Sequence, residues 1–222
     1  MTRTILIVGA SRGLGHAMAA EFLRKGWHVI ATERAPSSQL HALAGVEIET
    51  VDINEPDQLA ALRGRLAGRT LDIAFVNAGT TTREEHVRIG EVTTDEFVRV
   101  MVTNALSPMR AVEALHDLVP AAGVVGVMSS GQGSVANNET GMREVYRASK
   151  AALNQLMRSF AARQLGRSLV LMAPGWVKTE LGGPDARLTI DESVPNLVNV
   201  LISKLGRPGL EYLDYLGRTV PW

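Results

Sequence analysis

A tyrosine and a lysine lie four positions apart, Tyr146 and Lys150, in a stretch whose apolar residues repeat as in a helix. Side chains four apart on a helix leave the same face, about one turn from each other. A phenol with an ordinary pKa of ~10 exchanges protons poorly at neutral pH, and a neighbouring ammonium lowers that pKa by favouring the phenolate. The pair is therefore a candidate acid–base centre, although without other motifs such a spacing more often marks an exposed helical pair.

A second candidate is a glycine-rich turn that follows the apolar run Thr4–Val8. Gly9, Gly13 and Gly15 are spaced G-x-x-x-G-x-G and open the helical stretch Gly13–Lys25. Glycines permit backbone angles closed to other residues, and they let a pyrophosphate approach the main chain at the start of a helix. A plain strand-to-helix turn is the alternative, but the position after the first strand of an alternating chain favours a nucleotide site. The turn is completed by Ser11, Arg12 and Leu14.

Short β-branched runs alternate with longer amphipathic stretches along the chain, which is typical of a parallel sheet flanked by helices. The expected strands are Thr4–Val8, His28–Thr32, Glu47–Val51, Asp72–Val76, Gly123–Met128 and Leu169–Met172, with a short last one around Tyr212–Tyr215. The expected helices are Gly13–Lys25, Pro56–Leu66, a broken one over Thr94–Val119, Glu144–Leu165 and Ile190–Leu205. We therefore predict an α/β fold, a single-domain Rossmann fold over residues 1–222 with a doubly wound parallel sheet of about seven strands and helices on both faces.

The composition argues against several classes of function. The 222 residues hold 23 Lys and Arg against 23 Asp and Glu, so nothing suggests affinity for nucleic acid or an anionic membrane. There is no cysteine, which excludes disulfides and thiolate chemistry. The five histidines show no ligand spacing, and no segment approaches the ~20 apolar residues of a membrane span. We expect a cytoplasmic protein without a metal site, a nucleic-acid partner or a membrane anchor.

Five further segments stand after expected strands or inside expected helices. They are Asp52-Ile53, Asn77-Ala78-Gly79, Asn104, Ser130 and Pro174-Gly175-Trp176-Val177-Lys178-Thr179. Together with the glycine turn and the Tyr146/Lys150 pair, and in this order, they resemble the short-chain dehydrogenase/reductase family over almost the whole chain. The segment Pro174–Thr179, the compact length and the final Gly217–Trp222 are most similar to the C-factor and sniffer-type carbonyl reductase branch.

This resemblance implies an NAD(P)(H)-dependent oxidoreductase that interconverts a carbonyl and an alcohol by hydride transfer. In such an enzyme Tyr146 is the general acid and base, Lys150 lowers its pKa and holds the nicotinamide ribose, and Asn104 anchors a water in a proton relay. A serine hydroxyl bonds the substrate oxygen; Ser130 is assigned because the family's serine is usually the second of such a pair, and Ser129 is the alternative. A cofactor-binding regulatory or signalling protein with little turnover is the alternative function, although such relatives usually lose the tyrosine or the lysine.

The resemblance also assigns the cofactor contacts. They are Gly9, Ser11, Arg12, Gly13, Leu14, Gly15, Glu33, Arg34, Asp52, Ile53, Asn77, Ala78, Gly79, Tyr146, Lys150, Pro174, Gly175, Val177 and Thr179. Asp52-Ile53 holds the adenine, and Asn77 ties the central strands together beside the cofactor. Glu33 would bond the ribose 2′-hydroxyl of NAD(H), whereas Arg34 and Arg12 would bind the 2′-phosphate of NADP(H). Two arginines against one carboxylate favour NADP(H) over NAD(H).

The substrate region follows the sixth expected strand. Many relatives carry a long helical lid there, but Glu180–Arg187 is short and rich in glycine. We expect an open pocket, walled by Trp176, Leu181 and the loop Gly131–Arg143, in which a small carbonyl or alcohol compound contacts Ser130. The resemblance further implies a homodimer paired through the two long helices, with a homotetramer as the alternative.

Overall fold

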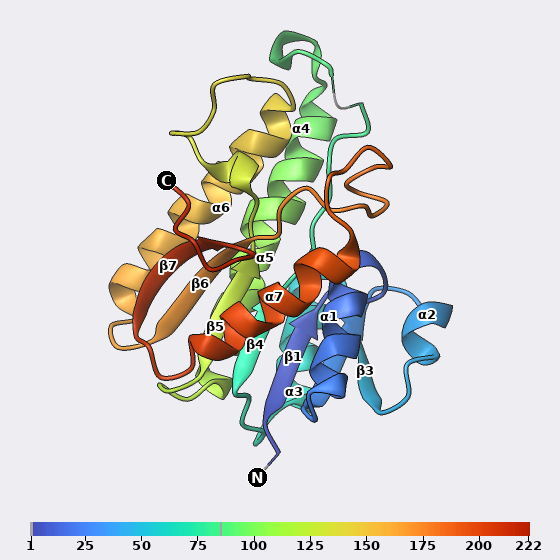
Figure 1. Ribbon diagram of the computed structural model, residues 1–222, viewed down its shortest axis with the longest axis vertical. Coiled ribbons are helices and arrows are strands. Elements are labelled where there is room, and N and C mark those ends of the chain that lie inside the picture. Colours follow the sequence, from blue (N-terminus) through green and yellow to red (C-terminus); the bar gives the residue numbers. More distant parts are fainter. Residues whose placement is uncertain (1, 85) are drawn as a thin grey trace.

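A sheet of seven parallel strands forms the centre of the protein in a computed structural model, which describes residues 2–84 and 86–222 (Figure 1). The strands are β1 (Thr4–Val8), β2 (His28–Glu33), β3 (Val46–Thr50), β4 (Ile73–Val76), β5 (Val124–Met128), β6 (Ser168–Ala173) and β7 (Gly209–Asp214). Their order across the sheet is β3-β2-β1-β4-β5-β6-β7. The chain therefore moves outward from β1 in one direction and then in the other, and the point of reversal lies between β1 and β4.

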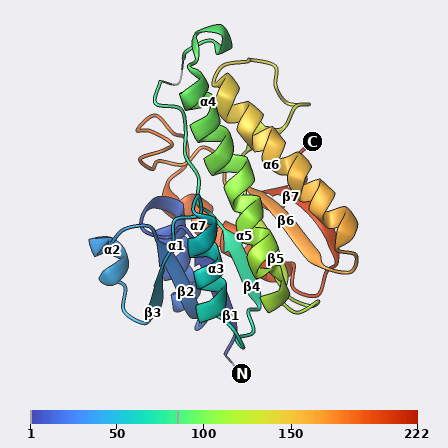
Figure 2. The same ribbon diagram turned by 180° about the vertical axis from the view of Figure 1, so that it is seen from behind.

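Helices cover both faces of this sheet. The helices α1 (Gly13–Arg24) and α7 (Ile190–Ser203) lie on the face seen in Figure 1. The opposite face carries α3 (Pro56–Arg65), α5 (Ser107–Leu115) and α6 (Glu144–Arg163), with α4 (Thr94–Met101) continuing α5 upward (Figure 2). A short α2 (Ser38–His41) lies between β2 and β3 in the chain. The predicted doubly wound α/β fold is confirmed.

Side-chain alternation along the strands divides the core into two layers. In β1, Ile5 and Ile7 pack in the layer under α1 and α7, whereas Leu6 and Val8 pack in the layer under α3, α5 and α6. Successive side chains of a strand point to opposite faces, so a strand covered on both sides must be apolar throughout. This is the physical reason for the continuous apolar runs in the sequence.

The long helical stretch after β4 is broken, as its sequence predicts. Residues 102–106 form a π-helical segment (Val102–Leu106) between α4 and α5, and Asn104 lies inside it. A π-helical turn widens the backbone ladder, and such turns occur frequently at functional sites. A 3-10 turn (His116–Leu118) ends the stretch.

Some elements differ from the expectation. The strand β7 begins at Gly209, three residues before the expected Tyr212, because it pairs with β6 along its whole length from Ser168 opposite Gly209. Single turns were not foreseen: α2, capped by Ser37, and the 3-10 turns Ile89–Glu91 and Gly131–Gly133. One turn of helix is too short to show a hydrophobic period.

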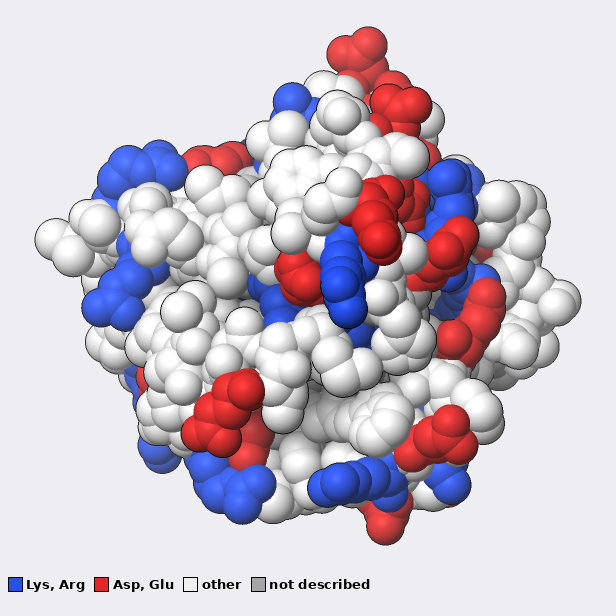
Figure 3. All heavy atoms as spheres, turned by 90° about the horizontal axis from the view of Figure 1, so that it is seen from above, with Lys and Arg blue, Asp and Glu red and all other residues white. Residues whose placement is uncertain are grey.

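Among the residues that the structure describes, no helix combines the length and the apolar character needed to cross a membrane. The carboxyl ends of the strands meet at the upper end of the molecule, and Figure 3 looks down on that end. Basic and acidic side chains of the described residues are interleaved there, and those residues form no large area of one charge on this face. The surface is hollowed near the middle, where some Lys or Arg atoms lie recessed.

Candidate active site

The glycine turn after β1 is packed so closely at Gly9 and Gly15 that a side chain would not fit at either position. Gly9 has φ +89°, and a Cβ built on it would lie 2.8 Å from the backbone of Ala78. A Cβ on Gly15 would lie 2.1 Å from the carbonyl oxygen of Gly9. The amide of Asn77 donates to that same carbonyl at 2.7 Å, so it ties the end of β4 to the turn, which is the structural role predicted for it.

The start of α1 leaves its backbone N–H groups without a side-chain cap. The helix begins at Gly13, the capping residue Arg12 makes no side-chain hydrogen bond to it, and its first turn carries no acidic residue. The first N–H groups of a helix need an external acceptor, and the helix dipole favours a negative charge there. A tight glycine cradle that opens onto an uncapped helix start fits the phosphates of a dinucleotide.

Glu33 has both carboxylate oxygens engaged inside the protein. It is 3% exposed; one oxygen accepts from the backbone N–H of Ser37 at 2.8 Å, and the other lies 2.7 Å from Nε2 of His41. The Ser37 hydroxyl in turn donates to the carbonyl of Ser11 in the glycine turn at 2.6 Å. The carboxylate therefore holds the segment after β2 against the glycine turn, which differs from the contact with the ribose expected from the sequence.

Two arginines at this end of the sheet have exposed side chains. Arg34 lies 4.0 Å from a carboxylate oxygen of Asp52, and 74% of its side chain is exposed. Arg12 pairs with Glu180 at 2.6 Å, and 69% of its side chain is exposed. Exposed ion pairs contribute little to stability, so both guanidinium groups can exchange their carboxylate for another anion at small cost. Next to Asp52, Ile53 is buried in the core under α3.

The candidate acid–base pair lies on α6, where both residues are buried. Tyr146 is 7% exposed and Lys150 is 4% exposed. The lysine Nζ lies 6.0 Å from the centre of the tyrosine ring and donates to the carbonyl of Met128, at the end of β5, at 2.9 Å. Burial lowers the pKa of the Lys150 ammonium to about 8, since removal from water disfavours the charged form. The predicted neighbours are thus brought together at the carboxyl edge of the sheet.

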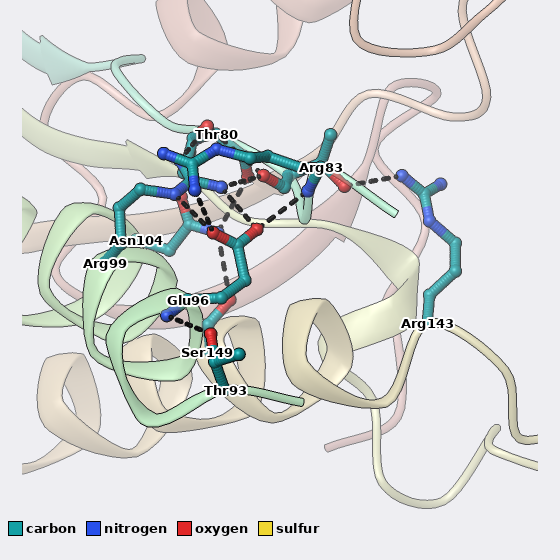
Figure 4. A network of polar contacts seen from close by, with 9 residues as sticks. Thr80, Arg83, Thr93, Glu96, Arg99, Asn104, Arg143 and Ser149 are labelled. Carbon is teal, nitrogen blue, oxygen red and sulfur yellow. Dashed lines mark hydrogen bonds and ion pairs between the residues drawn. The ribbon is translucent and has the colours of Figure 1, made fainter. Parts of the chain in front are cut away.

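The side chain of Asn104 joins three elements of the site (Figure 4). Its carbonyl oxygen accepts from the N–H of Thr80 at 2.8 Å, and its amide donates to the Thr80 carbonyl and to the Ser149 hydroxyl, each at 2.9 Å. Ser149 donates onward to the carbonyl of Tyr146 at 2.7 Å. A Cβ on Gly79 would lie 3.3 Å from the Asn104 oxygen and 3.4 Å from Nζ of Lys150, so the segment after β4 passes close to both. Asn104 is fully buried.

An ion pair on α4 extends this network and was missed in the sequence. Arg99 donates to the Thr80 hydroxyl and the Thr81 carbonyl, at 3.1 and 2.7 Å, and pairs with Glu96 at 2.8 Å (Figure 4). The hydrogen bonds from Arg99, helped by the backbone N–H of Arg83, lower the pKa of Glu96 to about 2. Charges three apart on a helix look like a solvated face, so no sequence signal distinguished this pair.

Arg143, just before α6, also reaches the site. Its guanidinium donates to the Thr81 hydroxyl at 3.0 Å and lies 4.9 Å from the centre of the Tyr146 ring. Both Met142 and Arg143 have positive φ, at 55° and 52°. That conformation is uncommon for residues other than glycine, and such strained positions concentrate at functional sites.

The two candidate serines after β5 have different surroundings. Ser129 is 2% exposed, and its hydroxyl donates to the side-chain oxygen of Asn154 at 2.6 Å. Ser130 is half-buried, and its hydroxyl oxygen accepts from the N–H of Gln132 at 3.2 Å. A hydroxyl that accepts in this way keeps its hydrogen for donation. The geometry therefore favours Ser130 over Ser129 as a donor to a substrate.

The segment after β6 lies beside the glycine turn. The carbonyl of Pro174 accepts from Ser193 at 2.8 Å, Gly175 has φ +82°, and Val177 is buried. Thr179 is the nearest neighbour of a Cβ built on Gly13.

The two expected wall residues of the pocket are open to solvent. Trp176 and Leu181 are 47% and 40% exposed, and the Trp176 indole N–H donates to the carbonyl of Gly182 at 2.7 Å. Val135 and Met142, in the other expected wall, are also exposed.

The fold and the site together define a dinucleotide-binding protein with a buried tyrosine and lysine at the carboxyl edge of the sheet. Residues 3–187 match the family described as short chain dehydrogenase, and the chain belongs to that family. The protein is an oxidoreductase that works with a nicotinamide cofactor, as its motifs predict.

Individual relatives agree with this assignment. The chain is 35% identical to C-signal from Myxococcus xanthus over 156 residues, which cover 68% of this chain and 93% of that protein. It is similar to the solved structure of a Burkholderia multivorans protein described as a short-chain dehydrogenase/reductase with bound NADP, with 64% identity, a TM-score of 0.98 and 100% of each chain covered. It is also similar to carbonyl reductase Sniffer of D. melanogaster, with 29% identity, a TM-score of 0.89 and 100% of each chain covered. The predicted resemblance to the C-factor and sniffer-type branch is confirmed.

Proposed function

We propose that the protein reduces a small carbonyl compound, or oxidises the corresponding alcohol, with Tyr146 as general acid and base. The observation that carries the proposal is the position of Lys150, whose Nζ lies 6.0 Å from the centre of the Tyr146 ring and donates to the carbonyl of Met128. The nicotinamide, when bound, supplies or accepts the hydride. In the reduction, Tyr146 gives its proton to the carbonyl oxygen and Lys150 stabilises the phenolate left behind.

Ser130 and Asn104 assist this step. The Ser130 hydroxyl donates to the same substrate oxygen and stabilises the negative charge that develops there. Asn104 holds the segment after β4 next to Lys150 and anchors the water through which protons return to the tyrosine. Its buried position in the π-helical segment, bonded to Thr80 and Ser149, supports this role.

The cofactor would be held by residues of the glycine turn and by the ends of the neighbouring strands. The residues are Gly9, Ser11, Arg12, Gly13, Leu14 and Gly15 around the pyrophosphate; Arg34, Asp52 and Ile53 at the adenosine; Asn77, Ala78 and Gly79 beside the ribose; and Tyr146, Lys150, Pro174, Gly175, Val177 and Thr179 at the nicotinamide end. The tight packing of Gly9 and Gly15 and the uncapped start of α1 support this arrangement.

Within this arrangement the cofactor is NADP(H) rather than NAD(H). Glu33, which would repel a 2′-phosphate if it faced the ribose, has both oxygens bonded to Ser37 and His41. Arg34 and Arg12 remain at the surface in exposed pairs that a phosphate can replace. The NADP described for the Burkholderia multivorans structure supports the same choice.

The substrate is a small carbonyl or alcohol compound that binds in a half-open pocket. Trp176 and Leu181 line one side of this pocket, and the loop Gly131–Arg143 lines the other. The assembly is a homodimer through the face formed by α4, α5 and α6. Phe97, Val98, Leu106 and Leu156 give that face large exposed apolar side chains, which supports pairing there.

The test is a panel of aldehydes, ketones and alcohols, followed by absorbance of the reduced nicotinamide with each cofactor in turn. We expect NADPH consumption with at least one class of carbonyl compound and a lower rate with NADH. Tight NADPH binding without turnover on any compound would favour the alternative of a cofactor-sensing regulatory protein.

A further inference from the structure

A second tyrosine hydroxyl, outside the catalytic pair, is buried against the candidate serine. Tyr212 lies on β7, is 1% exposed, and its hydroxyl donates to the backbone carbonyl of Ser130. Its ring lies 5.5 Å from the ring of Trp222, and Val220 donates to its backbone carbonyl at 2.8 Å. The ring is therefore held on several sides, and the hydroxyl reaches the serine from β7, a strand to which we assign no residue that holds the cofactor.

Tyr212 remains a hydrogen-bond donor at neutral pH. Burial raises the pKa of its phenol above the ordinary value, while the side chains of Asn154 and Ser129 beside the hydroxyl oppose the rise. The charge of a Tyr146 phenolate would also raise the pKa of Tyr212, because it disfavours a second negative charge nearby. A phenol in these surroundings keeps its proton and cannot replace Tyr146 as the acid–base group.

The Ser130 carbonyl is the point where the tyrosine acts on the serine. This carbonyl accepts from Tyr212 and also from the N–H of Gly133 at 2.8 Å, which closes the 3-10 turn Gly131–Gly133. Within the same turn, the N–H of Gln132 donates to the Ser130 hydroxyl oxygen. Because backbone and hydroxyl are bonded to the same short turn, a hold on the carbonyl also orients the hydroxyl.

A second set of contacts supports the same turn from α6. Asn154 accepts from the Ser129 hydroxyl at 2.6 Å and donates to the Gly133 carbonyl at 3.3 Å. A Cβ on Gly133 would lie 3.0 Å from both Asn154 and the backbone of Lys150. The turn is therefore fixed between β7 and α6, with little space for it to shift.

We propose that Tyr212 is a positioning residue for the candidate catalytic serine, a role that depends on the proposed function of Ser130. Its hydroxyl sets the orientation of the Ser130 carbonyl, and through the 3-10 turn it directs the serine hydroxyl toward the substrate oxygen. Tyr212 itself touches neither substrate nor cofactor. Ser129 and Asn154 complete the support.

The test is a double-mutant cycle with Tyr212→Phe, Ser130→Ala and the double variant. The phenylalanine keeps the ring and removes only the hydroxyl. We expect Tyr212→Phe to lower kcat for carbonyl reduction roughly tenfold, with the Kd for NADPH unchanged, because a misdirected donor stabilises the transition state less well. In the double variant kcat should equal that of Ser130→Ala within about twofold, because residues that act as a unit are not additive.

Tyr215→Phe is the matched control, since Tyr215 packs in the layer under α1 and α7 whereas Tyr212 packs in the opposite layer. It should leave kcat unchanged. A double variant whose losses multiply would show that Tyr212 acts independently of Ser130 and would overturn the inference, as would an unchanged kcat in Tyr212→Phe. If Ser130→Ala itself loses no activity, the failure lies in the proposed role of Ser130, and the inference falls with it.

Should Tyr212→Phe melt below the assay temperature, Ser129→Ala takes its place in the cycle, because it removes a hydroxyl from the same support and leaves Tyr212 packed. We expect the same pattern, a lower kcat for the single variant and no further loss on the Ser130→Ala background. Multiplying losses would overturn the inference in this form as well.

Discussion

The cofactor side of this site, around the glycine turn, is more tightly packed than the substrate side, around Trp176 and Leu181. On the cofactor side, Gly9 and Gly15 pack against backbone at distances that leave no space for a Cβ, and Glu33 fixes the segment after β2. On the substrate side, Trp176 and Leu181 are 47% and 40% exposed. The two sides share one sheet edge, yet only the first is packed like a protein core.

This contrast follows from what each side must recognise. The nicotinamide cofactor is a single compound, so the backbone groups that bind it can be fixed in advance and lose little freedom when it binds. An open wall of exposed apolar side chains orders itself around whatever compound enters, at some cost in affinity. The chain thus combines a prepared site for the cofactor with a permissive one for the substrate, and the following changes test that division.

The largest effect is expected from Gly15→Ala on the cofactor side. The added Cβ would lie 2.1 Å from the carbonyl oxygen of Gly9, so the turn must move. We expect the Kd for NADPH to rise about 100-fold or more, roughly 3 kcal/mol. Gly131→Ala is the control. No atom of the described residues lies within 4 Å of a Cβ built there, so the Kd of this variant for NADPH should not change. An equal Kd for NADPH in the two variants would contradict the claim that the glycine turn is shaped for the cofactor before it binds.

Lys150, at the boundary of the two sides, predicts a pH-dependent stability. Its pKa is about 8 in the folded protein, against an ordinary 10.5, so the unfolded chain binds more protons between these pH values. The wild type should therefore gain stability relative to Lys150→Met as the pH rises from 8 to 10.5, by about 3 kcal/mol in total. Urea unfolding of both proteins at several pH values measures this, and a constant difference would contradict the buried ammonium.

Arg34→Ala tests which residue of the cofactor side distinguishes NADPH from NADH. If Arg34 binds the 2′-phosphate, the Kd for NADPH should rise about tenfold, because one charge-assisted contact is lost. The Kd for NADH, which lacks the phosphate, should remain unchanged. Fluorescence titration with both cofactors measures the change, and equal weakening of the two would remove Arg34 from the phosphate contact.

The smallest effect is expected on the substrate side. Leu181→Ala shortens a side chain that is already 40% exposed. We expect KM for a good carbonyl substrate to rise only about two- to threefold, with kcat and the Kd for NADPH unchanged, because little apolar area is lost. A loss of kcat as large as that of a catalytic variant would show that this wall is as firmly built as the cofactor side.

The fold could be predicted because its signals are local and repeated. The apolar strands, the helical periods and the glycine turn each lie in the sequence where the structure has the corresponding element, and a break within Thr94–Val119 was expected, although its place at Asn104 was not. The orientation of Glu33 could not be, since its partners Ser37 and His41 belong to a single-turn helix without a periodic signal. The hydrogen bond from Tyr212 to Ser130 could not be predicted either, because only the folded sheet brings these two distant residues together.

The most direct test of the central claim is a single-turnover measurement of hydride transfer, with wild type and Tyr146→Phe each loaded with NADPH and mixed with a carbonyl substrate. At saturating NADPH, the phenylalanine variant should transfer hydride about 10³-fold more slowly than the wild type, since the general acid is gone. A transfer rate within tenfold of the wild type, at equal cofactor binding, would contradict the assignment of Tyr146 as the group that protonates the substrate.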